Sequence, residues 1–203
     1  MSIKDKKYIK IIVFVVCAVL ILWLFGWWAG WWAGKNAVIG DIGPSGGYIF
    51  YDKGSYSNGW RYLEAAPAVN EYTSIVWGGF GRTVGGTGIA IGTGKSNTER
   101  IVAKFGDVEP YEKRADYAAK LCADLVVTKD GVTYDDWFLP SKDELDLMYE
   151  NLWRKGSFAD SHRYWSSSEL NDSTAYQRTF IRGESMPFEI RYTECNVRPV
   201  RAF

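Results

Sequence analysis

The longest apolar stretch of the chain lies near its N-terminus. The 24 residues from Ile11 to Gly34 carry no charge, and Lys35 ends the stretch. A helix of this length reaches about 36 Å, at about 1.5 Å per residue, whereas the hydrocarbon core of a bilayer is about 30 Å thick. The pattern therefore predicts one transmembrane helix over residues 11–34.

The apolar pattern changes after a short linker at residues 35–43. Short apolar runs at residues 47–51 and 60–66 flank the turn-forming segment 52–59, so a β-hairpin is expected there. Residues 78–96 hold eight glycines, and this composition favours an extended loop region over regular secondary structure.

Helical patterns occupy the middle of the chain. Asn97 is expected to cap a short helix that carries Ile101 and Phe105 on one face. A second helix is expected over residues 112–127. Its apolar face would consist of Ala115, Ala118, Ala119, Cys122, Leu125 and Val126.

The clearest helix signal begins at Ser141. Ser141 and Glu144 have the spacing of a capping box. The apolar stripe behind them consists of Leu145, Met148 and Leu152. Beyond this helix, strands are expected at residues 164–168, 175–182, 188–192 and 196–201. Strands at both ends with helices between them predict an α+β fold in which a small antiparallel sheet joins both ends of the domain.

Composition fits one folded domain with a short appendage. The 203 residues include 24 Lys and Arg against 24 Asp and Glu, which gives a net charge of zero. This balance argues against a nucleic-acid-binding protein, because such proteins need a basic surface that neutralises phosphates. A content of 47% hydrophobic and 16% aromatic residues argues against a disordered chain. We place the folded domain at residues 44–203.

Charge is unevenly distributed around the expected span. Residues 1–10 contain four lysines and one aspartate, a net charge of +3, whereas only Lys35 lies shortly after the span. By the positive-inside rule, residues 1–10 form a cytoplasmic basic tail and residues 44–203 lie in the periplasm or at the cell surface. A cleaved signal peptide is the alternative, but no small-x-small cleavage site follows the apolar stretch.

Four tryptophans stand at the outer end of the expected span. They are Trp27, Trp28, Trp31 and Trp32. Indole rings at this position are typical of the aromatic belt at a membrane interface. The glycines and alanines between them recur every four residues, as in close helix contacts. Assembly of a homo-oligomer through the membrane helix, in a structural membrane protein, is therefore an alternative role.

Five motifs occur in the order found in a bacterial domain family. They lie at residues 46–52, 87–94 with 97–98, 136–141 with 144–145, 164–169 and 197–201. Together they resemble the C-terminal domain of the Legionella collagen-like adhesin, over about residues 43–203. The resemblance implies a C-type-lectin-like fold, related to that of formylglycine-generating enzyme, in which long loops carry the function.

Most residues of these motifs are better explained by structure than by chemistry. Trp165 is a large apolar side chain suited to a core, and the serines at residues 166–168 can hydrogen-bond to loop backbone. Arg198 and Arg201 are expected to brace a loop through carboxylates such as Glu144.

Residues for catalysis or metal binding are scarce. His162 is the only histidine and lies in a polar turn, so neither a catalytic triad nor a Cys/His metal cluster is expected. Glu169, Asn171 and Asp172 come closest to a calcium site, but the Glu-Pro-Asn triplet of calcium-dependent lectins is absent. The sequence assigns no catalytic residue, no metal and no cofactor.

Cys122 and Cys195 are the only cysteines outside the expected span. In an oxidising compartment they could form a disulfide. Cys122 also lies on an apolar face, and a plain buried thiol explains it equally well. A reactive cysteine would instead support an enzyme of the formylglycine-generating type. The only argument for that alternative is similarity of fold, and fold does not imply function.

The loops between the last strands are the best candidate for a ligand surface. They mix aromatic and polar side chains, a composition suited to recognition. The candidate residues are Trp165, Asn171, Tyr176, Arg178, Arg182, Glu184, Tyr192 and Asn196. Some proteins that the chain resembles are targets of diversity-generating retroelements, which vary loop residues near the C-terminus of this fold. We therefore predict a non-catalytic, membrane-anchored module that binds a surface protein or a glycan.

Overall fold

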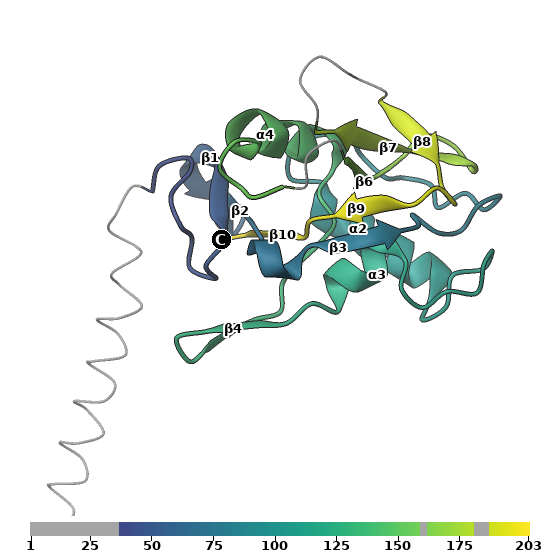
Figure 1. Ribbon diagram of the computed structural model, residues 1–203, viewed down its shortest axis with the longest axis horizontal. Coiled ribbons are helices and arrows are strands. Elements are labelled where there is room, and N and C mark those ends of the chain that lie inside the picture. The colour runs from purple at the N-terminus through teal and green to yellow at the C-terminus, as the bar shows by residue number, and fades with distance from the viewer. Residues whose placement is uncertain (1–36, 159–161, 181–186) are drawn as a thin grey trace, which may run out of the picture. The chain divides into compact units, whose positions relative to one another are not determined.

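The computed structural model describes residues 37–158, 162–180 and 187–203 (Figure 1). Residues 38–203 form one compact unit of mixed α+β structure, which confirms the α+β part of the predicted fold. The predicted tail at 1–10, span at 11–34 and tryptophan belt lie outside the described residues. Within the described part of the chain, no helix has the length and apolar character needed to cross a membrane.

A three-stranded antiparallel sheet joins the two ends of the domain (Figure 1). Its strands, in spatial order, are β1 (Tyr48–Ser57), β2 (Trp60–Ala65) and β10 (Val200–Ala202). Ala65 of the central strand lies opposite Tyr48 on one side and Val200 on the other. This register confirms both the predicted hairpin and the predicted sheet between the ends of the domain.

A five-stranded sheet forms most of the remaining β structure. Its strands, in spatial order, are β3 (Tyr72–Ile75), β9 (Cys195–Val197), β6 (Arg163–Glu169), β7 (Thr174–Thr179) and β8 (Phe188–Ile190). Only the β6–β9 pair is parallel among the described strands of this sheet. The predicted strand at 196–201 is split between the two sheets, because Pro199 has no N–H to donate to a ladder.

Three short elements lack a clear sequence pattern. They are the 3-10 helix η1 (Ala68–Asn70), strand β3, and a hairpin of β4 (Val127–Lys129) and β5 (Val132–Tyr134). Each strand among them is three or four residues long, which is too short for alternation to stand out.

The first two helices differ from their predictions. Helix α2 (Gly94–Phe105) begins before Asn97, so Asn97 is not its cap, although Ile101 and Phe105 are buried as expected. The helix predicted at 112–127 is wrong except for α3 (Ala118–Ala123). Ala115 and Val126, placed on its apolar face, are exposed.

Helix α4 (Lys142–Leu152) confirms its prediction in detail. Ser141 is the N-cap, and both reciprocal hydrogen bonds of the capping box with Glu144 are present. Leu145, Met148 and Leu152 are buried. Local sequence was sufficient here because a capping box joins residues only three positions apart.

The buried apolar side chains form two main clusters. One contains Trp77 and Trp165 and lies among α2, α3 and strands of the five-stranded sheet. The other contains Phe50, Leu63 and Tyr164 and lies between α4 and the three-stranded sheet. The long segment between β3 and α2 is left outside regular structure, as its glycine content predicted, but the loop predicted at 78–96 ends earlier because α2 begins at Gly94.

Candidate ligand-binding surface

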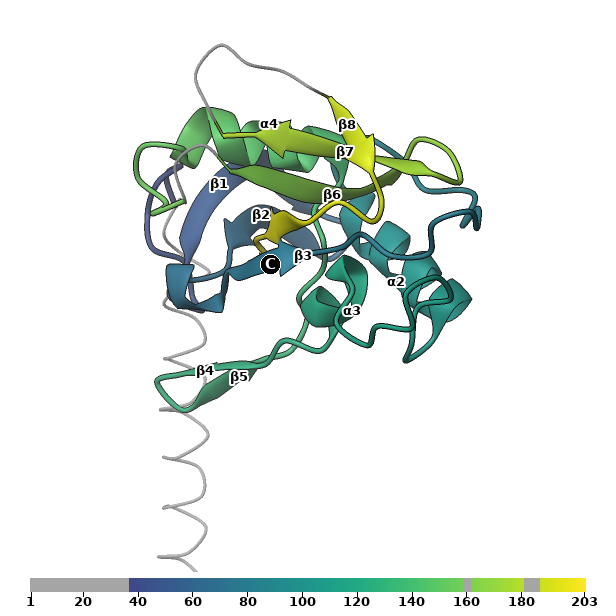
Figure 2. The same cartoon turned by 45° about the vertical axis from the view of Figure 1, so that its right-hand side comes forward.

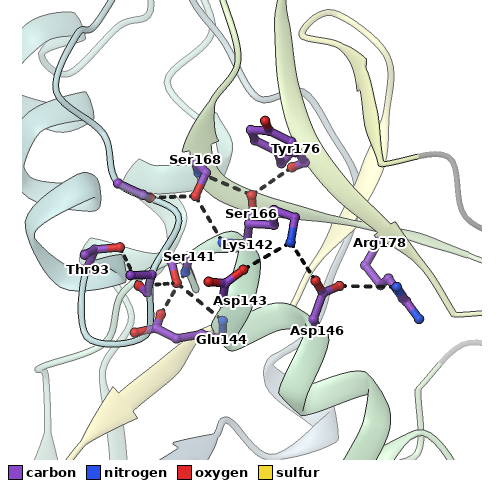
Figure 3. A network of polar contacts seen from close by, with 12 residues as sticks. Thr93, Ser141, Lys142, Asp143, Glu144, Asp146, Ser166, Ser168, Tyr176 and Arg178 are labelled. Carbon is purple, nitrogen blue, oxygen red and sulfur yellow. Dashed lines mark hydrogen bonds and ion pairs between the residues drawn. The ribbon is translucent and has the colours of Figure 1, made fainter.

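The N-terminus of α4 holds the glycine-rich loop at residues 85–93 in place (Figure 3). Ser141 Oγ donates to the carbonyl oxygen of Ala90 over 2.9 Å, and Gly92 N donates to the Glu144 carboxylate over 2.7 Å. Burial raises the pKa of Glu144, against the stabilisation of its charged form by backbone N–H groups. The capping box therefore positions a loop as well as a helix.

Polar residues of the sequence motifs tie the same loop to the sheet. Ser168 Oγ donates to the Gly88 carbonyl over 2.8 Å and accepts from Lys142 N over 3.0 Å (Figure 3). Asn97 Nδ2 donates to the same carbonyl over 2.7 Å and to Ser167 Oγ over 3.1 Å. These contacts confirm that the motif serines connect backbone segments.

The two C-terminal arginines have partners other than the expected one. Arg198 Nε lies 2.9 Å from Glu71 Oε2, and Arg201 Nε lies 2.7 Å from Asp136 Oδ1. The expectation that Glu144 braces them is wrong, because its carboxylate already accepts from backbone N–H groups. Both arginines are buried, so their ion pairs connect segments in the interior of the domain and are not part of an exposed surface.

Two of the predicted ligand residues are in the interior. Trp165 is 0% exposed, and its Nε1 donates to the Ile75 carbonyl over 2.8 Å. Asn196 is 3% exposed, and its Nδ2 donates to Glu71 Oε1 over 3.0 Å. Their assignment as ligand contacts is wrong, since neither side chain reaches solvent.

Three further predicted residues give no ligand contact that can be described. Arg182 and Glu184 lie outside the described residues. Asn171 is exposed in the β6–β7 turn, where its Oδ1 accepts from Ser173 N over 2.8 Å and Thr174 N over 2.9 Å. The amide oxygen of Asn171 therefore closes the turn.

Tyr176 and Arg178 do lie on an outward surface, formed by β7 and β8. Tyr176 lies opposite Phe188 and Thr174 lies opposite Ile190, so these side chains share one side of the sheet. Phe188 is 47% exposed and Ile190 is 37% exposed. We call Thr174, Tyr176, Arg178, Phe188 and Ile190 the β7–β8 face.

Charged side chains of α4 border this face (Figure 3). Arg178 Nη1 lies 3.3 Å from Asp146 Oδ1, and its guanidinium lies 4.3 Å from the ring centroid of Tyr149. Lys142 Nζ lies 3.0 Å from Asp143 and 3.0 Å from Asp146. The hydrogen bond to Asp146 raises the pKa of Lys142. The border is thus a network of both charge signs.

Tyr192 belongs to a second exposed surface, made of three aromatic rings. Its ring lies 5.0 Å from Phe80 and 6.2 Å from Tyr111, nearly parallel to Tyr111 at 26°. Phe80 and Tyr111 are themselves 5.0 Å apart. Tyr111 is 49% exposed and Tyr192 is 44% exposed. We call Phe80, Tyr111 and Tyr192 the aromatic patch.

Sequence reasoning missed Phe80 and Tyr111. They come from the segment after β3 and the loop after α2, whereas Tyr192 follows β8, so no sequence spacing connects the three rings. One sequence signal could have indicated them: each is an aromatic residue within an expected loop, where a binding surface is a more natural role than core packing.

Glu109 fastens the loop that carries Tyr111. Its carboxylate accepts from Gly79 N over 2.7 Å and from Tyr111 N over 2.9 Å, and it also accepts from Glu112 N. Burial acts against the charged carboxylate, but these backbone donors outweigh it and lower the pKa of Glu109. The loop is thereby joined to the backbone beside Phe80.

Arg191 fastens the other two segments of the aromatic patch. It is 0% exposed, and its Nη2 lies 2.5 Å from Glu169 Oε1. Its guanidinium also donates to the carbonyl oxygens of Arg82, over 2.9 Å, and of Asn171. The same group lies 4.2 Å from the ring centroid of Trp77. The exposed rings therefore stand on a buried ionic framework.

A recess adjoins the aromatic patch. It is lined by the three rings of the patch together with residues that include Gly78, Gly79 and Glu112. Gly79 has a φ of 65°, and a Cβ there would lie 2.1 Å from the ring of Phe105. Only glycine fits this close approach of backbone to ring.

The buried carboxylate of Glu169 is not available for calcium. It accepts from Val84 N over 2.8 Å and Gly85 N over 2.7 Å, besides pairing with Arg191. In the described segments, no group of three or more His, Cys, Asp and Glu side chains is arranged to hold a metal ion.

Cys122 and Cys195 are free thiols in this structure, and both belong to the core cluster around Trp165. Burial raises the pKa of Cys195 to about 12 and raises that of Cys122 well above its usual value. The structure therefore has two buried thiols at these positions and not a disulfide.

No protein-family model matches the chain, and no curated protein matches it. The resemblance to the adhesin domain family therefore rests on the sequence motifs.

Proposed function

We propose that the chain is a membrane-anchored, extracytoplasmic module that binds a surface protein or a glycan and catalyses no reaction. The observation that carries this proposal is the aromatic patch. Tyr111 and Tyr192 are about half exposed, yet the loops beneath them are fastened by the buried side chains of Glu109 and Arg191. A rigid aromatic surface binds with little loss of conformational entropy, which is the usual requirement of a binding hot spot.

The position of the patch within the domain also favours recognition. The segments that carry it, and β8 with them, lie at the end of the domain away from β1, in both views (Figures 1 and 2). The aromatic patch therefore lies away from the strand with which the domain begins. This arrangement agrees with the C-type-lectin-like fold that the motifs suggest, in which loops carry the function.

The enzyme alternative lacks support at its essential group. An enzyme of the formylglycine-generating type would need a reactive cysteine, and a thiolate forms where positive groups and solvent lower the pKa. Cys122 is 0% exposed and Cys195 is 3% exposed, and burial raises the pKa of both. These environments favour unreactive core thiols.

The proposal is tested by screening the full chain, held in lipid nanodiscs, against glycan and cell-surface protein arrays. The patch variant combines Tyr111→Ser with Tyr192→Ser. Its matched control is Tyr56→Ser, which removes a tyrosine that is 71% exposed at the β1–β2 turn. Circular dichroism confirms that each variant is folded.

We expect a ligand that binds the wild type and the control, and that binds the patch variant about thirtyfold or more weakly, because one lost hot spot costs about 2 kcal/mol or more. A ligand that binds all three proteins equally would refute the aromatic patch as the site. In that case Tyr176→Ser with Phe188→Ser would test the β7–β8 face.

A further inference from the structure

Exposed aliphatic side chains gather where the domain begins. Val38 is 64% exposed, Ile39 is 41% exposed and Ile42 is 48% exposed. They lie in an ordered turn, because Asp41 N donates to the Val38 carbonyl over 3.0 Å and Ile42 forms a β-bridge with Tyr48. The turn thus presents three apolar side chains outward in a fixed arrangement.

Lysines flank this turn on two sides. A Cβ at Gly40 would lie 3.1 Å from Lys155 Nζ, and a Cβ at Gly46 would lie 3.1 Å from Lys129 Cδ. Lys129 pairs with Asp130. Lys155 is exposed and makes no ion pair with any residue of the described ranges. Lys155 therefore places one positive charge without an ion-pair partner in the described ranges beside this apolar surface, while the carboxylate of Asp41, within the turn, accepts from Val38 N over 2.9 Å.

Chain length places this turn close to the membrane. The expected span ends at Gly34, four residues before Val38, and four extended residues reach at most about 14 Å. The headgroup region on each side of a bilayer core is about 6 Å thick. Val38 therefore cannot be far from lipid headgroups when the chain is anchored.

We propose that Val38, Ile39 and Ile42 insert into the headgroup region of the membrane that anchors the chain, with Lys155 beside lipid phosphates. This inference rests on the proposed transmembrane anchor. Apolar side chains next to lysines bind membrane interfaces, because the apolar groups leave water while the amines stay at the phosphates. Because Ile42 pairs with Tyr48 at the start of β1, docking in this way would hold the end of the domain away from β1, with the aromatic patch, away from the membrane (Figures 1 and 2).

The test uses the full chain, reconstituted in vesicles of phosphatidylcholine with a minority of phosphatidylglycerol. A photoreactive diazirine amino acid replaces Ile42 in one variant and Val108 in the control. The two positions match closely, since Ile42 is 48% exposed and Val108 is 47% exposed, and Val108 follows α2 far from the turn in sequence. After illumination, lipid adducts at each position are measured by mass spectrometry.

We expect about fivefold or more lipid adduct at position 42 relative to position 108, because only the former lies in the headgroup region. Flotation of the vesicles after an alkaline wash measures the anchor separately. A chain that does not float overturns the anchor and this inference together. A chain that floats but forms equal adducts at both positions overturns this inference alone.

Discussion

Arg191 and Glu169 form a buried ion pair next to the aromatic patch, with Nη2 2.5 Å from Oε1 and neither side chain more than 6% exposed. The pair joins the β8–β9 turn to the end of β6. Arg191 also donates to the carbonyl oxygen of Arg82, in the segment between β3 and α2. One arginine thus holds together segments that are distant in sequence.

We expect Arg191→Leu to lower the free energy of unfolding of the domain by about 3–5 kcal/mol, because it leaves the Glu169 carboxylate buried without its partner. The measurement is urea unfolding of the full chain in detergent micelles, followed by near-ultraviolet circular dichroism. The matched control is Arg178→Leu. Its pair with Asp146 is partly solvated, at 25% and 28% exposure, so a loss below about 1 kcal/mol is expected. Equal losses for the two variants would contradict this account.

Glu109 makes the stability of the patch depend on pH. Its pKa is lower in the folded state than its ordinary value of 4.5, so the carboxylate contributes stability above about pH 4.5. That contribution is lost as the pH falls through the lowered pKa. We expect Glu109→Gln to unfold more easily than wild type at pH 7 and to lose less stability between pH 5 and pH 3, values that bracket about 4.5.

Urea midpoints measured across this pH range check the expectation. Glu112→Gln serves as control, because its side chain is 36% exposed and lies 3.9 Å from Arg114. It should follow the wild-type pH dependence. A Glu109→Gln profile parallel to that of wild type would show that Glu109 is not the titrating group.

Sequence predicted the parts of this fold that depend on neighbours along the chain. Ser141 and Glu144 satisfy each other's backbone groups within one helical turn, so their spacing alone locates the start of α4. The β1–β2 hairpin follows equally from turn residues between two apolar runs.

Sequence failed where a side chain bonds to a distant segment. Asn97 has a residue type that favours helix caps, but its amide bonds to Gly88 and Ser167 instead. The helix predicted from residue 112 does not start there, because Lys113 has a φ of 62°, a left-handed backbone conformation that an α-helix cannot include. The aromatic patch was hidden for the same reason, since only the folded chain brings Phe80 and Tyr111 to Tyr192.

Trp165 was predicted from sequence to contact the ligand, whereas the structure places it in the core. Because its ring is 0% exposed in the core, we expect Trp165→Ala to lower the free energy of unfolding by about 3–5 kcal/mol. Trp165→Phe should cost less, and once folded it should keep wild-type ligand affinity. Unfolding in urea and binding to the array-selected ligand measure the two effects. A folded Trp165→Phe protein with tenfold weaker binding, a loss of about 1.4 kcal/mol, would restore Trp165 to the ligand site.

The two domain cysteines should resist alkylation while the domain is folded. With a pKa of about 12, the Cys195 thiol is ionised to a fraction on the order of 10⁻⁴ at pH 8, and burial also blocks access. N-ethylmaleimide labelling of a Cys17→Ser chain, followed by mass spectrometry, should give no adduct before urea is added and two adducts afterwards. Rapid labelling of one thiol in the folded chain would favour the cysteine enzyme.

The contact between Ser141 and Ala90 makes the glycine-rich loop depend on a helix cap. We expect Ser141→Ala to lower the free energy of unfolding by about 0.5–2 kcal/mol, because the cap is lost. Hydrogen exchange should also become faster at residues 88–93, since the Ala90 carbonyl loses its donor from α4, although it still accepts from Thr93, and Glu144 loses its orientation. The loop after α2 is the internal control, because Glu109 holds it independently of Ser141. If both loops exchanged faster to the same degree, Ser141 would support the whole domain rather than this loop, and the link from helix cap to glycine-rich loop would be wrong.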